Sequence, residues 1–239
     1  MAKTRTMICQ GCWAQKRLPV PLRGVASLPF RAFGIKPSRM NPNTCSMCET
    51  MFEWMMKARQ VSIDATVLFA DLRGYTKLSQ SESATTISDM LDAFYDCCAE
   101  AIWERSGLLN KTMGDAVMAV FNFPIKRADH AEQAVLAARL IQDHCKTLRA
   151  SIDGDGSEGL AVGIGIDCGT VSFGEFGRSH HDVTAIGTVV NLAARAQAAA
   201  AAGEILITEA VRRRLSSDVG AGREFALKGF DEPTRLYSA

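Results

Sequence analysis

The feature that most restricts the fold is an alternation of short apolar runs and amphipathic segments along residues 61–239. The apolar, β-rich run at Thr66–Ala70 predicts a buried strand. After a glycine-containing turn, apolar residues recur at helical spacing, which predicts an amphipathic helix. Two further apolar runs, at Leu108–Thr112 and Ala116–Phe121, predict a hairpin. The inner face of the helix carries Ile87, Met90, Leu91, Phe94, Cys98 and Ala101.

The alternation continues to the C-terminus. We expect helices over residues 129–149 and 188–200. The order strand, helix, strand, strand, helix, strand predicts an α+β fold, with a ferredoxin-like βαββαβ core, extra strands and helices, and a mostly antiparallel sheet covered by helices. The other expected elements are strands at Leu160–Ile166, Thr170–Phe173, His181–Ile186, Glu204–Ile207, Glu224–Leu227 and Arg235–Tyr237, and a helix at Glu209–Leu215.

The first 60 residues differ in composition from the rest of the 239-residue chain. They hold ten basic and two acidic residues, five of the seven prolines and four of the eight cysteines. The whole chain has a net charge of only +1, so residues 61–239 carry a net charge of −7. This shift predicts a small basic module rich in cysteine and proline at residues 1–60, followed by a domain of catalytic size at residues 61–239.

The composition excludes several classes of protein. Hydrophobic residues make up 47% and charged residues 22%, which is a globular balance and excludes global disorder. The longest stretch without a charge, residues 183–194, is shorter than the ~18 residues that a membrane-spanning helix needs. The N-terminal charges are not followed by an apolar run, so we expect no signal peptide and a cytoplasmic location.

Four of the cysteines form two C-x-x-C pairs, Cys9 with Cys12 and Cys45 with Cys48. Two such pairs can supply the four thiolates of a tetrahedral zinc site, although the gap between these pairs is longer than in common zinc modules. Buried cysteines without a ligand, and redox or iron–sulfur chemistry, are the alternatives. Apolar residues at helical spacing over residues 47–55 predict a linker helix after the second pair.

The basic charge of the module has several interpretations. It can attract nucleic acid or a membrane surface. However, only one aromatic residue, Trp13, lies near the basic pair Lys16 and Arg17, and no nucleic-acid-binding motif is present. We therefore expect a solvated basic face, or one that docks on the acidic domain, and no nucleic-acid partner.

Two aspartates are candidate metal ligands. Asp71 follows the first buried strand and precedes a turn, Gly74-Tyr75-Thr76, whose backbone N–H groups can point at phosphate oxygens. Asp115 lies in the predicted hairpin turn. Paired carboxylates beside phosphates are a common way to hold Mg²⁺. Taken singly, each aspartate can also be an ordinary loop or turn residue.

Three basic or amide side chains are further candidates. Lys111 flanks the same hairpin as Asp115. Asn191 and Arg195 are four residues apart and therefore share one face of a helix. That face can line a ligand or form an interface, and spacing alone does not separate the two.

Taken together, three segments are more specific than their parts. They are VLFADLRGYT at residues 67–76, KTMGDAVMAVF at 111–121 and TAIGTVVNLAAR at 184–195. In this order and spacing they resemble the class III nucleotidyl cyclases, and the resemblance extends over about residues 61–239.

The resemblance implies a two-metal reaction. Its two aspartates correspond to Asp71 and Asp115, which would bind two Mg²⁺ or Mn²⁺ ions, with the Leu72 backbone as a further ligand. One ion activates the ribose 3′-hydroxyl and the other holds the triphosphate. The hydroxyl attacks the α-phosphorus, and pyrophosphate leaves.

The resemblance also implies roles for five other residues. Lys111 and Thr184 would bind the purine, and a lysine with a hydroxyl favours adenine, as in a threonine-bearing subgroup of adenylate cyclases that bicarbonate or CO₂ often stimulates. Asn191 would position the ribose, and Arg195 would neutralise charge on the α-phosphoryl group. Lys228 resembles a triphosphate-binding lysine.

In this family the active sites form between two subunits arranged head to tail. The resemblance therefore implies a homodimeric adenylate cyclase that acts on ATP. The alternatives are a guanylate cyclase, a catalytically silent nucleotide-binding regulator, and a chain whose working part is a zinc-dependent docking module. Two segments depart from the family pattern, Asp167-Cys168-Gly169 and Gly187-Thr188, and neither carries a catalytic role there.

Overall fold

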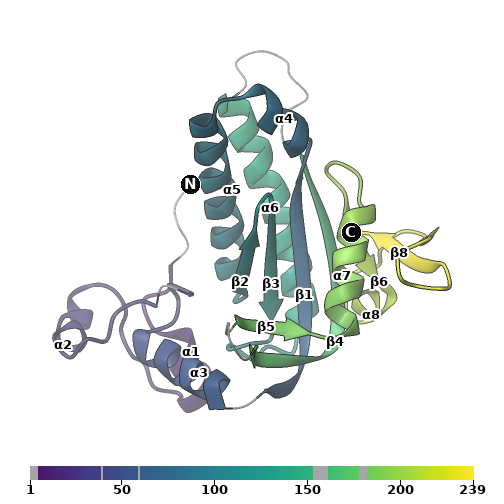
Figure 1. Cartoon of the computed structure of the whole chain (residues 1–239). Coiled ribbons are helices and arrows are strands. Elements are labelled where there is room, and N and C mark those ends of the chain that lie inside the picture. Colours follow the sequence, from purple (N-terminus) through teal and green to yellow (C-terminus); the bar gives the residue numbers. More distant parts are fainter. Residues whose placement is uncertain (1–4, 39, 59, 153–160, 178–181) are drawn as a thin grey trace.

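The computed structural model describes residues 5–38, 40–58, 60–152, 161–177 and 182–239. The expected strand starts at Leu160 and His181 lie outside these residues. Figure 1 shows helices α5 (Ala84–Glu104) and α6 (His130–Ile152) on one side of a twisted sheet and α7 (Thr188–Ala199) on the other. The expected α+β class and the βαββαβ core are confirmed.

The long strand β1 (Val61–Arg73) lies in the middle of the sheet. It pairs antiparallel with β3 (Ala116–Phe121) on one side and with β4 (Ala161–Phe176) on the other. Successive side chains of a strand point to opposite faces. Accordingly, Leu68 packs under α5 and α6, whereas Phe69 packs toward α7.

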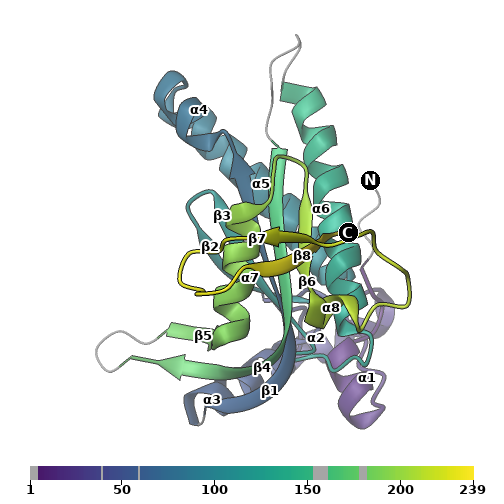
Figure 2. The same cartoon turned by 90° about the vertical axis from the view of Figure 1, so that its right-hand side faces the viewer.

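The described residues form an eight-stranded sheet with the order β2-β3-β1-β4-β6-β8-β7, and β5 pairs with the far end of β4. The β4–β6 pair is parallel, and the other pairs are antiparallel. Figure 2 shows β6, β7, β8 and the short helix α8 together beyond β4. The remaining bounds are β2 Leu108–Met113, β5 Asp182–Ile186, β6 Ile205–Thr208, α8 Glu209–Arg212, β7 Arg223–Phe225 and β8 Thr234–Ser238.

Helix α5 begins where the sequence provides a cap. The Ser83 hydroxyl accepts a hydrogen bond from the backbone N–H of Thr86, which satisfies one of the unpaired donors of the first turn. Phe94 and Ile102 of α5 are fully buried against the sheet, together with Ile141 of α6. No helix of the described part of the chain combines the length and the apolar character needed to cross a bilayer.

Helix α7 lies unusually close to the sheet at Gly165. A Cβ atom placed on this glycine would lie 2.0 Å from the backbone nitrogen of Gln197 and 2.4 Å from the carbonyl oxygen of Ala193. Because both atoms belong to helix backbone, neither can move aside easily. The absence of a side chain at Gly165 therefore sets how closely α7 packs on β4.

The structure corrects one element. Residues 160–166 and 170–173 were expected to form two strands, but Ala161–Phe176 is one continuous strand. The segment Asp167-Cys168-Gly169 does not interrupt it, because all three residues pair with β1. The Asp167 carboxylate is buried and accepts a hydrogen bond from the Thr208 hydroxyl, so a polar residue is accommodated inside the sheet.

Two elements around the first motif also differ from expectation. Strand β1 extends beyond Thr66–Ala70 at both ends, so Asp71 lies within the strand. A short helix that the sequence did not predict, α4 (Tyr75–Ser81), separates β1 from α5. Residues 61–65 alternate between apolar and polar, which is the pattern of a half-buried strand, so the sequence carried a signal for the longer strand that the prediction did not use.

The N-terminal module contains little regular structure. Its helices are α1 (Gln10–Lys16), α2 (Leu28–Ala32) and α3 (Ser46–Ala58), with a 3₁₀ turn at Val25–Ser27. Helix α3 lies where the sequence predicts a linker helix, and it precedes β1 in the chain (Figure 1).

Polar contacts join the module to the C-terminal end of α5. The Asn41 and Asn43 side-chain amides each donate to a backbone carbonyl, of Gly107 and Trp103 respectively, both at 3.2 Å. In return, the Trp103 indole donates to the carbonyl oxygen of Met40 at 2.8 Å. These bonds fix the loop that precedes Cys45 on the larger domain.

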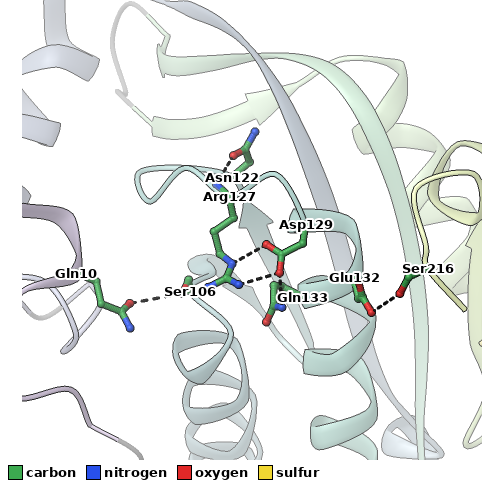
Figure 3. Close-up of polar contacts among 8 residues, drawn as sticks. All are labelled: Gln10, Ser106, Asn122, Arg127, Asp129, Glu132, Gln133 and Ser216. Carbon is green, nitrogen blue, oxygen red and sulfur yellow. Dashed lines mark hydrogen bonds and ion pairs between the residues drawn. The ribbon is translucent and has the colours of Figure 1, made fainter. Parts of the chain in front are cut away.

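Two further contacts complete this interface. Figure 3 shows the Gln10 side chain of α1 reaching Ser106, whose hydroxyl donates to it at 3.5 Å. Phe52 of α3 is buried against Phe123 and Phe173, with ring centroids 4.9 and 6.1 Å away. Phe52 therefore belongs to the core on the α7 side of the sheet, although it lies before the predicted boundary at residue 60, and that boundary stays a prediction.

We predict that Gly165→Ala lowers the free energy of unfolding by about 3 kcal/mol, because the new methyl group must displace α7 from β4. Chemical denaturation of the natural chain and of the variant measures the difference in the free energy of unfolding. Gly220→Ala is the matched control, since a Cβ there meets no atom within 4 Å, and it should change stability by less than about 0.5 kcal/mol. Equal losses in both variants would contradict the close approach.

Candidate active site

The two candidate metal ligands lie side by side. Asp71 is near the C-terminal end of β1 and is paired with Ala116, the first residue of β3. Asp115 precedes Ala116 in the turn between β2 and β3, and its carbonyl oxygen accepts a hydrogen bond of 3.0 Å from the backbone N–H of Leu72. The expected proximity of Asp71 and Asp115 is thus present within one chain.

The electrostatics of this pair suit a cation. Burial raises the pKa of Asp71, and the negative charge of Asp115 raises it further. The Arg73 guanidinium, 2.9 Å from the Asp71 carboxylate, opposes this shift but does not cancel it. Carboxylates that repel each other in a half-buried position are the ligands that Mg²⁺ or Mn²⁺ prefers, so these residues fit a divalent ion.

Arg73 is a site residue that the sequence analysis did not single out. Its guanidinium donates to Asp71 and to the backbone carbonyl of Gln197 in α7, which ties β1 to that helix. The Arg73 guanidinium occupies the space beside Gly163. A Cβ atom at residue 163 would lie only 2.3 Å from the Arg73 Nη2 atom, so this position of Arg73 requires glycine there. The available signal was the i, i+2 spacing of Asp71 and Arg73, which places both on one face of a strand.

Tyr95 is a second residue that sequence reasoning missed. Its hydroxyl donates a hydrogen bond from α5 to the carbonyl oxygen of Gly114, which holds the turn that carries Asp115. Gly114 has a φ of 61°, a conformation that favours glycine. Burial raises the pKa of Tyr95, and the nearby Tyr75 and Asp115 raise it further. No local pattern in α5 indicates this long-range contact.

Of the predicted turn Gly74-Tyr75-Thr76, only Gly74 precedes α4, because the other two residues begin that helix. Gly74 adopts a φ of 85° at the start of α4, and its carbonyl oxygen accepts hydrogen bonds from Lys77 and Leu78. Tyr75 is half-buried and Thr76 is exposed. The turn thus begins three residues beyond Asp71.

A third residue, Asn110, links the two strands that carry the candidate purine-binding residues Lys111 and Thr184. Lys111 is paired with Met118, which belongs to the core on the α7 side, so Lys111 points to that face. Its neighbour Asn110 lies at a bulge in β2. The Thr184 hydroxyl donates to the Asn110 amide oxygen at 3.2 Å, and the Asn110 amide donates to the carbonyl oxygen of Val183 at 2.9 Å. Asn110 therefore joins β2 to β5, which sequence reasoning did not predict.

Asn191 and Arg195 lie one turn apart on α7, as their spacing predicts, and both are exposed. The Gln197 side chain is hydrogen-bonded to the Asp71 carboxylate, and it lies two residues beyond Arg195. Two residues correspond to about 200° around an α-helix, so Arg195 points away from its own chain's aspartates.

Lys228 is not brought near the aspartates. It is exposed in a turn after β7, which forms the opposite edge of the sheet from β2. Four strand spacings of about 4.8 Å, or roughly 19 Å, separate β1 from β7.

The four N-terminal cysteines do come together. The Sγ atoms of Cys9, Cys12, Cys45 and Cys48 all lie within 4.8 Å of one another, and each cysteine is free of a disulfide. This cluster lies in the module at the start of β1, whereas Asp71 is near the other end of the same strand (Figure 1).

A family model described as the adenylate and guanylate cyclase catalytic domain matches residues 57–237, which include both aspartates, the purine-binding candidates and α7. The chain belongs to this family. The resemblance seen in the three sequence motifs is thereby confirmed.

The similar proteins include both adenylate cyclases and guanylate cyclases. An adenylate cyclase from Anabaena cylindrica is 35% identical over 181 residues, which cover 72% of this chain and 36% of that relative. The crystal structure of the adenylyl cyclase CyaB from P. aeruginosa has a TM-score of 0.71 and 31% identity, covering 75% of this chain and 95% of that one. The guanylyl cyclase Cya2 has a TM-score of 0.70 and 25% identity, covering 75% and 92%. The chain spans about a third of the length of the curated relatives it matches.

The raised pKa of Asp71 makes the stability of this cyclase domain depend on pH. A carboxyl whose pKa is raised by folding destabilises the folded state as pH rises from its ordinary pKa through the raised value. Without divalent ions, Asp71→Asn should therefore unfold at the same or a higher temperature than the natural chain at about pH 7, and this difference should shrink toward about pH 4.

Asp129→Asn is the control of opposite sign. A hydrogen bond from Arg127 lowers the pKa of Asp129 to about 2, so this carboxylate stabilises the fold at neutral pH and its loss should lower the unfolding temperature there. Thermal unfolding at the two pH values measures both variants. A clear loss of stability in metal-free Asp71→Asn at pH 7 would contradict the repulsion described above.

Proposed function

We propose that the chain is an adenylate cyclase that converts ATP to 3′,5′-cyclic AMP and pyrophosphate. The observation that carries this proposal is the placement of Asp71 and Asp115 side by side at the end of β1, within a domain of the cyclase family. The adenine preference rests on Lys111 and Thr184, which lie on strands that Asn110 joins by its hydrogen bond with Thr184. An adenylate cyclase among the relatives is consistent with it.

Asp71 and Asp115 would hold Mg²⁺ or Mn²⁺, two ions per site, with the Leu72 backbone as a further ligand. The bound ions would supply positive charge that favours ionisation of the 3′-hydroxyl and offsets the triphosphate. In the reaction, a bond forms between the 3′-oxygen and the α-phosphorus. The bond from the α-phosphorus to the oxygen bridging to the β-phosphate breaks, and pyrophosphate leaves with that electron pair. The proton of the 3′-hydroxyl passes to solvent.

The other site residues bind and orient the substrate. The backbone N–H groups of Gly74, Tyr75 and Thr76 face the phosphates at the start of α4. Asn191 orients the ribose, and Arg195 neutralises the charge that develops on the α-phosphoryl group. Lys228 contacts the triphosphate from a second chain, because the sheet separates it from the aspartates of its own chain.

The active site is composite in this proposal. Arg195 and Asn191 are exposed on the side of α7 that faces away from Asp71, so a second copy of the chain must present them. Two copies arranged head to tail form two such sites, since each copy gives its aspartates to one site and its α7 residues to the other.

We predict that the chain uses ATP in preference to GTP, and that Lys111→Glu combined with Thr184→Cys lowers the rate with ATP by about tenfold or more, because one good polar contact to a base is worth about 1–3 kcal/mol. Assays of pyrophosphate release with each nucleotide, with and without bicarbonate, measure this. Stimulation by bicarbonate is expected from Thr184.

The other outcomes identify the alternatives. Higher turnover with GTP would assign a guanylate cyclase, in line with the similarity to Cya2. Binding of either nucleotide without turnover at saturating Mn²⁺ would indicate a silent regulator.

We predict that Asp71→Asn and Arg195→Ala chains, each inactive alone, recover activity when mixed. In a mixed dimer both lesions fall in one site, and the other site is intact. With random exchange half of the dimers are mixed, so activity should approach roughly a quarter of the natural level. No recovery despite measured subunit exchange would show that both residues serve a site within one chain.

A further inference from the structure

We propose that Cys9, Cys12, Cys45 and Cys48 bind one Zn²⁺ ion as a structural tetrathiolate site that holds the N-terminal module together and in place on the cyclase domain. The family model does not include these residues, since its match begins at residue 57. The zinc proposal therefore does not rest on the proposed cyclase activity.

The distances between the thiols have the size of a zinc tetrahedron. The Sγ–Sγ separations are 3.7 Å for Cys9–Cys48, 3.6 Å for Cys12–Cys45, 3.5 Å for Cys12–Cys48 and 3.7 Å for Cys45–Cys48. A tetrahedron with Zn–S bonds of about 2.3 Å has edges of about 3.8 Å. A disulfide would require about 2.05 Å, so the four sulfurs are arranged around a common centre and not in bonded pairs.

The short distances between the sulfur atoms also favour a single metal ion over an iron–sulfur cluster. A cluster holds two or four irons and their bridging sulfides between its cysteines, which keeps thiolates on different irons well apart. Here all four Sγ atoms lie within 4.8 Å of one another, which leaves room for one ion only.

Backbone N–H groups beside the cluster donate hydrogen bonds to a sulfur atom, as is typical around metal-bound thiolates. Cys9 Sγ accepts hydrogen bonds from the backbone N–H groups of Cys12 and Cys45, at 3.4 and 3.2 Å. Such donors stabilise the negative charge of metal-bound sulfur. A Cβ at Gly11 would lie 3.0 Å from the Cys48 Sγ atom, so glycine lets the first C-x-x-C turn approach the second.

The module has little else to hold it together. Its buried cluster consists of Cys9, Cys12, Val20, Leu22 and Cys45, so three of its five members are candidate ligands. A unit of this size seldom folds on apolar burial alone and commonly needs a metal or cross-links. One ion would join the segment around α1 to the start of α3.

The cluster is mechanically linked to the cyclase domain on both sides of Cys45. Before it, Asn41 and Asn43 are hydrogen-bonded to the end of α5. After it, α3 carries Phe52 into the core beside Phe123. Fixing Cys45 and Cys48 on a metal therefore fixes both contacts, and we expect metal loss to lower the stability of the whole chain.

The test measures metal content and ligand geometry in the full chain. Elemental analysis should find about one zinc per chain, and replacement by Co²⁺ should give the intense visible bands of a tetrahedral cobalt thiolate. Cys45→Ser combined with Cys48→Ser should lose the bound metal and these bands. Cys97→Ser is the matched control, because this half-buried cysteine of α5 is not part of the cluster, and it should retain both.

A chelation experiment keeps the test independent of how the variants fold. Removing the metal from the natural chain should lower its unfolding temperature, and adding Zn²⁺ should restore it. Purified chain without stoichiometric metal, and with no cobalt bands after reconstitution, would overturn the proposal. So would stoichiometric iron in place of zinc, or metal retained by the double variant.

Discussion

The structure depends on the pairing of β1 along its whole length. All thirteen residues of β1 are in register with β4, and residues 66–71 are also paired with β3. Pairing on both edges keeps β1 in the middle of the sheet, where α5 and α6 cover one face and α7 covers the other, so alternate residues such as Leu68 and Phe69 enter different cores. It also brings Asp71 beside the turn that holds Asp115. The placement of the two carboxylates is thus a consequence of strand register, and a shift of one residue would turn Asp71 to the opposite face.

Charge at the end of β1 is balanced by residues from several elements. Asp71 is half-buried next to Asp115, and Arg73 offsets part of the repulsion while also binding the backbone of α7. Tyr95 reaches from α5 to hold the turn before Asp115. The sheet and both helical layers therefore contribute to one small region. That region retains unbalanced negative charge, which is the physical basis for proposing divalent ions there.

The opposite end of β1 is tied to the N-terminal module. Helix α3 precedes β1 in the chain, and Phe52 of α3 packs among aromatic residues of the cyclase core. A change in the module therefore has a direct mechanical route to the start of the strand whose other end carries Asp71. Asn43 adds a second connection through the end of α5. This arrangement makes the proposed zinc site relevant to the stability of the whole chain.

The sequence by itself determined the order of the core elements, the family, and the facing pairs that local periodicity controls, such as Asn191 with Arg195 on one helix. It did not determine that β4 is one strand, because Asp167 is polar and its buried partner Thr208 is distant in sequence. Contacts between distant segments also decided the roles of Arg73 and Tyr95, and the convergence of the four cysteines across their long gap. Periodicity reports which face of an element is apolar, whereas only packing decides which elements meet, and the functional contacts of this chain lie almost entirely between elements.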